Sequence, residues 1–127
     1  MSSISTSSPT SWVDTESQVR AVRSSAPHPQ STFHQFTVKQ EDRADALDFF
    51  EDAARWNRVK VEQEFDQSTV GDYGGGEGTY NTIKFNFLPD RADGTFSPDY
   101  LKKTESAKRM FEGRMRSAGI QNYAPAQ

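Results

Sequence analysis

The first two elements that the pattern predicts are a strand and a helix. Phe36 and Val38 alternate with polar neighbours in a run of β-forming residues from 32 to 39, so both should lie on one face of a sheet, together with His34. A helix should follow from Glu41 to Trp56, because apolar residues recur at helical spacing and acidic residues crowd the first turns. Its apolar stripe consists of Leu47, Phe50, Ala53 and Ala54.

Two more strands and a second helix follow. Apolar and charged residues alternate in 59–65 and again in 80–88, on either side of the Gly-rich segment 71–78, which predicts an antiparallel hairpin with a long flexible loop. Ser97, Pro98 and Asp99 then provide an N-cap, a proline at the first helical position and an acid in the first turn. The helix should run over 98–118 and end at Gly119, leaving 120–127 as a flexible tail.

The resulting order, β-α-β-β-α, predicts one α+β domain over residues 31–119. A right-handed crossover places the first strand beside the third in a three-stranded sheet, with both helices on one face. This layout resembles the ferredoxin-like split βαβ arrangement without its last strand. Many unrelated functions share that arrangement, so it implies no activity.

Residues 1–30 are rich in Ser, Thr and Pro and should form a disordered arm. Within it, Ser11 is a suitable cap for a short helix over 11–23. We interpret this stretch either as a weakly helical piece of tail or as a motif that docks on a partner or on its own domain. The docking hypothesis rests on Trp12, Val13, Val19 and Val22.

Composition and charge narrow the function classes. Of the 127 residues, 33% are hydrophobic, none is cysteine, and the formal net charge is −3. This charge disfavours bulk nucleic-acid binding, and the missing cysteines exclude disulfides and thiolate zinc sites. No apolar run is long enough to span a membrane, so we expect no membrane insertion. We expect a cytoplasmic protein, or one of an organelle stroma or matrix if the Ser-rich N-terminus is a transit peptide.

Candidate catalytic and metal-binding groups are few. Residues 71–78 lack the Lys-Ser/Thr ending of a phosphate-binding loop, and the calcium-loop pattern that begins at Asp90 fails because Leu101 holds its twelfth position. His34 is interpreted as a core or edge histidine, or alternatively as a base or ligand in a small enzyme or ligand-binding domain. We expect no catalytic set, no metal and no cofactor.

The chain offers two candidate binding surfaces within the predicted domain. Tyr73 and Tyr80, at the ends of the Gly-rich segment, are candidate protein contacts. The second helix is basic and is the candidate surface for nucleic acid, although helix-dipole stabilisation explains its cations equally well. Its cations are Lys102, Lys103, Lys108, Arg109, Arg114 and Arg116.

The sequence therefore favours a non-enzymatic protein-interaction module. We expect a small accessory, linker or regulatory subunit that docks into a larger protein assembly. A nucleic-acid-binding module that uses residues 98–118 is the first alternative. A small enzyme or ligand-binding domain is the second.

Overall fold

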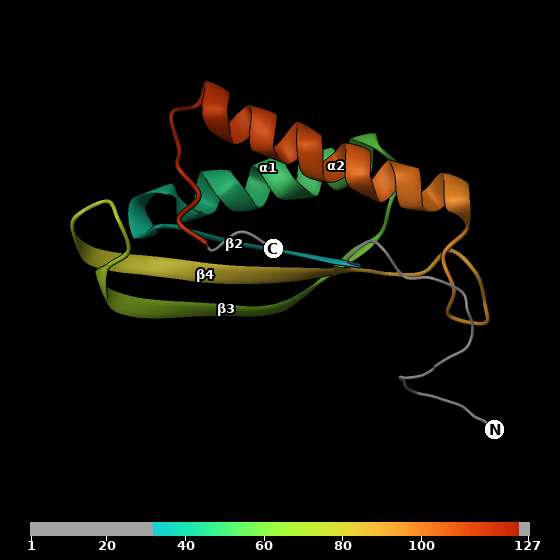
Figure 1. Ribbon diagram of the computed structural model, residues 1–127, viewed down its shortest axis with the longest axis horizontal. Helices are drawn as coiled ribbons and strands as arrows, with labels where there is room; N and C mark the ends of the chain where they lie inside the picture. Colours follow the sequence, from blue (N-terminus) through green and yellow to red (C-terminus); the bar gives the residue numbers. More distant parts are fainter. Residues whose placement is uncertain (1–31, 125–127) are drawn as a thin grey trace. The chain divides into compact units, whose positions relative to one another are not determined.

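The computed structural model describes residues 32–124, and this part of the chain contains three strands and two long helices (Figure 1). In chain order the elements are β2 (Phe33–Lys39), the short 3-10 helix η2 (Gln40–Asp42), α1 (Arg43–Trp56), β3 (Val61–Asp72), β4 (Glu77–Phe87) and α2 (Pro98–Ser117). The arm over 1–30, its helix over 11–23 and residues 125–127 lie outside the described residues. Within 32–124, no helix has the length and apolar content needed to cross a bilayer.

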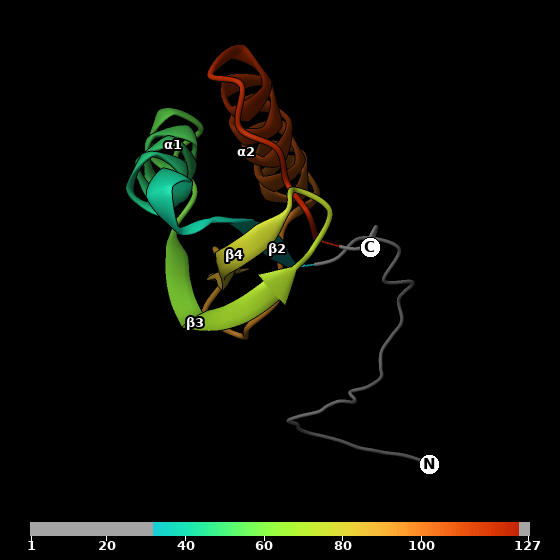
Figure 2. The ribbon, with the colours of Figure 1, turned by 90° about the vertical axis from the view of Figure 1, so that its left-hand side faces the viewer.

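The strands form one sheet in the order β2-β4-β3, with both neighbouring pairs antiparallel. The first strand therefore lies beside the third, and the two helices lie together on one face of the sheet (Figure 2). The predicted α+β class and the β-α-β-β-α order are confirmed.

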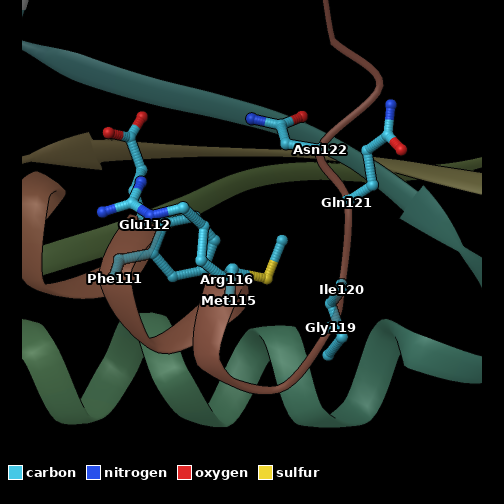
Figure 3. Close-up of a pocket in the computed structure, with 8 residues that line it drawn as sticks. All are labelled: Phe111, Glu112, Met115, Arg116, Gly119, Ile120, Gln121 and Asn122. Atoms are coloured by element: carbon cyan, nitrogen blue, oxygen red, sulfur yellow. The ribbon is translucent and has the colours of Figure 1, made fainter.

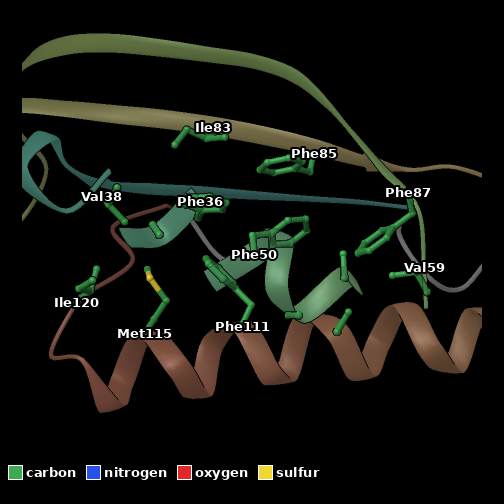
Figure 4. Packing of buried hydrophobic residues seen from close by; sticks show 14 of the residues in the cluster. Phe36, Val38, Phe50, Val59, Ile83, Phe85, Phe87, Phe111, Met115 and Ile120 are labelled. Carbon is green, nitrogen blue, oxygen red and sulfur yellow. The ribbon is translucent and has the colours of Figure 1, made fainter. Parts of the chain in front are cut away.

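The core fills the space between the sheet and the helices (Figure 4). Phe50 of α1 is at its centre, where its ring centroid lies 4.4 Å from that of Phe85 and 5.3 Å from that of Phe111. The predicted apolar faces supply this layer: Phe36 and Val38 of β2 are fully buried. The residues that the apolar periodicity placed on these faces thus form the core.

The hairpin between β3 and β4 is tighter than predicted. The ladder continues until Asp72 pairs with Glu77, so the connecting loop spans 73–76 instead of 71–78. The Asp72 carboxylate closes this turn, because Oδ1 accepts hydrogen bonds from the amides of Gly74 at 2.8 Å and Gly76 at 3.1 Å. The long flexible loop is corrected to a short turn.

Residues 120–124 pack against the domain instead of forming a free tail. The amide of Tyr123 donates to the Thr37 carbonyl at 2.8 Å, and the Thr37 amide donates to Oδ1 of Asn122 at 3.0 Å. Residues 120–124 therefore lie along the edge of β2 that faces away from β4. In the ferredoxin-like layout, the last strand would occupy this edge. The predicted flexible tail is corrected for these residues.

Candidate functional site

Trp56, the last residue of α1, is the most exposed aromatic side chain among the described residues. Its relative exposure is 77%, whereas nearly every other large apolar side chain of the described domain is buried or half-buried. The buried side of α1 consists of Ala46, Phe50, Ala53 and Ala54, and Trp56 lies outside it. Tryptophan is enriched at recognition surfaces, so an indole left in water makes this helix end a candidate site.

Trp56 borders a hollow of about 600 Å³ between the C-terminal end of α1 and the middle of α2. We call this hollow the Trp56 cleft. Both helices and the connection after α1 contribute to it, so it exists only in the folded domain. It is lined by Asp52, Arg55, Trp56, Arg58, Met110 and Arg114.

The charges of the Trp56 cleft are unequal, with three arginines and one aspartate. Asp52 holds two of the arginines: Oδ1 accepts from Arg55, and Oδ2 lies 3.8 Å from Nη2 of Arg114. The Arg114 guanidinium also lies 5.1 Å from the centre of the Phe49 ring. Arg58 forms no ion pair with any other described residue. The cleft is therefore locally positive on an acidic chain.

The backbone of Arg58 is unusual. Its φ is +59°, and it is the only non-glycine residue of the described domain with a positive φ. This conformation ends α1, because the Arg58 amide donates to the Arg55 carbonyl at 3.1 Å and the Val59 amide donates to the Ala54 carbonyl at 3.0 Å. This pair of hydrogen bonds is the Schellman motif, which usually has glycine at this position.

The end of α2 offers a direct comparison. There the Gly119 amide donates to the Arg116 carbonyl and the Ile120 amide donates to the Met115 carbonyl, so the hydrogen-bond pattern is the same. The residue in the left-handed conformation is now glycine, with φ of +74°. Two helices of one domain thus end alike, with Arg58 in one and Gly119 in the other.

A second hollow, of about 690 Å³, lies between the C-terminal half of α2 and the segment that follows it (Figure 3). Phe111, Met115 and Ile120 supply its apolar part, and Glu112 and Arg116 are its charged residues. Among the residues that line it, Glu112 is the only side chain with the chemistry of a general base. This arrangement is better suited to binding than to acid–base catalysis.

His34 lies in the core next to this second hollow without lining it. Its ring stacks on Phe50 at 5.8 Å and meets Phe111 edge-on at 5.5 Å, and neither ring nitrogen has a hydrogen-bond partner. Burial lowers the pKa of His34 to about 4, with a smaller contribution in the same direction from Lys108. The imidazole is therefore neutral at pH 7, and the interpretation as a core histidine fits its surroundings.

The two tyrosines predicted as contacts have different positions. Tyr73 is 44% exposed, but Tyr80 is 1% exposed, which corrects the expectation that its ring is accessible. The Tyr80 hydroxyl donates to the Gly76 carbonyl at 2.6 Å, and the Tyr123 ring packs edge-on against the Tyr80 ring. Tyr80 thus holds the hairpin turn, and only Tyr73 offers a surface.

The cations of α2 do not form a single surface. Arg114 belongs to the Trp56 cleft, and Lys108 is half-buried, with its Nζ 3.2 Å from a carboxylate oxygen of Glu105. Lys102, Arg109 and Arg116 are exposed and recur every seven residues, so these three share one side of the helix, whereas Lys103 is exposed on another side. The contacts of Trp12, Val13, Val19 and Val22 stay predictions, because these residues lie outside the described range.

The Trp56 cleft was not predicted from the sequence, although Arg114 was named among the cations of the second helix. One feature of the sequence could have indicated this site. A tryptophan lies between Arg55 and Arg58 at the predicted end of the first helix, in a position that does not continue the apolar stripe. Met110 and Arg114 come from the other helix, and nothing in the sequence links them to Trp56. The residues over 32–124 include no group of three or more histidine or acidic side chains placed to hold a metal ion.

Comparison with known proteins adds no family assignment. No protein-family model matches the chain, and neither a curated protein nor a solved structure matches it. The Trp56 cleft therefore has to be interpreted from its own geometry and charge.

Proposed function

We propose that this protein is a non-enzymatic protein-interaction module that binds a partner protein through the Trp56 cleft. The observation that carries the proposal is the exposed indole of Trp56, set among Arg55, Arg58 and Arg114. Tryptophan and arginine are enriched among the residues that dominate protein–protein binding energy, especially where they line a concavity. The role that fits such a surface is that of a small accessory, linker or regulatory subunit.

The rigid setting of Trp56 supports this role. It ends a helix whose last turn is fixed by main-chain hydrogen bonds, and Asn57 links this end to α2 through a contact of 3.8 Å between its Nδ2 and Sδ of Met110. A side chain presented from a fixed helix end loses little conformational entropy on binding.

A photocrosslinking experiment on the full chain tests the proposal. Benzoylphenylalanine replaces Trp56 in one protein and Val70 in a matched control, because Val70 is 79% exposed and lies near the hairpin end of β3. We expect crosslinks from position 56 to a defined partner in lysate of the source cells, and none to that partner from position 70. Equal crosslinking from both positions, or none from position 56, would contradict the proposal.

The arm is a second predicted contact region that the same assay can separate from the cleft. Trp12→Ala and Trp56→Ala in the full chain each remove one indole. If the cleft is the binding face, Trp56→Ala reduces partner capture while Trp12→Ala has a smaller effect. The reverse order would move the binding site to the arm.

A further inference from the structure

The left-handed backbone of Arg58 carries a cost that the end of α1 does not require. Glycine adopts this conformation without steric strain, as Gly119 does at the end of α2, whereas a residue with a side chain does not. The two Schellman hydrogen bonds at each helix end use only backbone amides and carbonyls, so glycine at position 58 would satisfy them equally well. The strain therefore has to be explained by the Arg58 side chain.

The helix dipole does not provide that explanation. A cation near the C-terminal end of a helix is favourable, but Arg55 already supplies one in the last turn of α1 without a strained backbone. Backbone strain retained at a surface cleft is a reason to look for recognition there. The side chain of Arg58 lines the Trp56 cleft.

The three arginines of the cleft differ in the partners they already have. Asp52 contacts Arg55 and Arg114 and so fixes their position, whereas Arg58 has no ion pair within the described residues. A guanidinium without an ion-pair partner, beside two arginines that share a single aspartate, is the natural site for a carboxylate from another molecule. Trp56 and Met110 supply apolar surface beside it.

We propose that the Trp56 cleft binds an acidic segment of the partner protein, with apolar groups of the segment on Trp56 and Met110 and a carboxylate on Arg58. The proposal rests on the proposed function and adds the chemistry of the partner and the residue that selects it. Charge complementarity supports this occupant, because the cleft contains three arginines and one aspartate.

The surroundings of the cleft favour an acidic peptide over nucleic acid. Asp45, Asp48 and Glu51 are exposed along α1, which leads to the cleft. A nucleic-acid strand needs a continuous basic track for successive phosphates, and α1 beyond the cleft presents carboxylates where that track would have to continue. A short peptide needs only the local contact with the arginines.

Direct binding of defined probes tests the proposal in the full chain. In a Trp12→Phe background the remaining indole is Trp56, so its fluorescence reports on the cleft. The probes are a peptide that alternates Glu with Leu, a matched peptide that alternates Lys with Leu, and a short oligothymidylate. We expect saturable binding of the Glu-Leu peptide, with a change in Trp56 emission. Tighter binding of either other probe would overturn the proposal.

Charge variants then test whether Arg58 is the residue of the cleft that selects the acidic peptide. Arg58→Gln should weaken binding of the Glu-Leu peptide by up to about fivefold, the range expected when one exposed ion pair is lost. Arg58→Lys should lose less, because it keeps the charge but not the two-pronged geometry. Arg91→Gln is the matched control, since Arg91 is exposed in the loop before α2 and lies outside the cleft.

The two proposals fail in different ways. If position 56 crosslinks a partner but the Glu-Leu peptide does not bind, or if Arg58→Gln and Arg91→Gln weaken binding equally, the acidic-segment proposal is wrong and the interaction module stands. If the peptide binds the Trp56 cleft and position 56 crosslinks no protein, the proposed function is wrong while the preference of the cleft for acidic peptides stands.

Discussion

Arg58 should destabilise the fold, and its replacement tests this. Arg58→Gly relaxes the left-handed backbone, and after the entropy cost of glycine we expect a net gain of about 0.5–1 kcal/mol in the free energy of unfolding. Gly119→Ala is the mirror experiment, because it places a side chain in the same conformation and should cost about 1 kcal/mol. Urea denaturation of both variants measures these changes. A loss of stability in Arg58→Gly would show that the side chain stabilises the domain by itself.

His34 should make stability depend on pH between its two pKa values. Its pKa is about 4 in the folded protein, whereas the ordinary pKa of a histidine side chain is 6.5. The unfolded chain therefore binds more protons between pH 4 and pH 6.5. The stability that depends on neutral His34 is fully present above pH 6.5 and is lost as the pH falls towards 4. From pH 7 to pH 5 the free energy of unfolding should fall by about 2 kcal/mol.

The control for this prediction is His34→Leu, which keeps an apolar group in the core. Urea denaturation at pH 7 and pH 5 should show a much smaller difference for the variant than for the natural chain. Exposed carboxylates such as Asp90 and Asp93, whose pKa values are lowered by hydrogen bonds from Ser97 and Thr95, titrate below this window. An equal pH dependence in both proteins would exclude His34 as its source.

At the scale of elements, the hairpin turn supports the segment after α2. A Cβ at Gly75 would lie 2.7 Å from Cζ of Tyr123 and 2.8 Å from Cε of Lys39, whereas a Cβ at Gly78 would meet no atom within 4 Å. Gly75→Ala should therefore displace Tyr123 from the turn, with a loss of about 1 kcal/mol, and Gly78→Ala should not.

Hydrogen exchange measures this displacement directly. The Tyr123 amide donates to the Thr37 carbonyl, so its exchange reports whether residues 120–124 stay on β2. We expect faster exchange of the Tyr123 amide in Gly75→Ala and an unchanged exchange rate in Gly78→Ala. Unchanged protection in both variants would mean that the contacts at Thr37 hold the segment without Tyr123.

The elements that the sequence predicted well are those whose bounds depend on neighbouring residues. Ser97, Pro98 and Gly119 marked the ends of α2, because caps act between residues a few positions apart. The second half of β3 was missed because most of its side chains between Asp66 and Asp72 are exposed, so no apolar alternation marks it. Pairing with β4 extends this strand, and pairing is a tertiary property.

At the scale of the whole molecule, the same distinction separates the core from the candidate site. The core follows from apolar periodicity, since each strand or helix shows its buried face in its own residues. The Trp56 cleft requires α1 and α2 to pack in one particular register, which brings Met110 and Arg114 beside Trp56. Sequence predicts the helices that carry these residues, but not their meeting point.

The central position of Phe50 gives a test of how far the domain depends on one core contact. Its ring packs against those of Phe36, Phe85, Phe87 and Phe111, so it joins α1 to the sheet and to α2. Phe50→Ala should cost about 3–5 kcal/mol, a large share of the stability of a domain of this size.

Phe65→Ala is the matched control for Phe50→Ala, because Phe65 is half-buried and pairs with Lys84 at a register irregularity of β3. Urea denaturation should show the larger loss for Phe50→Ala. Phe50 also holds α1 against α2. In the Trp12→Phe background, Phe50→Ala should therefore change the Trp56 emission of the folded protein, without any urea. Losses of similar size in the two variants would mean that the core tolerates a cavity at Phe50, and unchanged Trp56 emission would mean that other contacts between the helices hold the Trp56 cleft together.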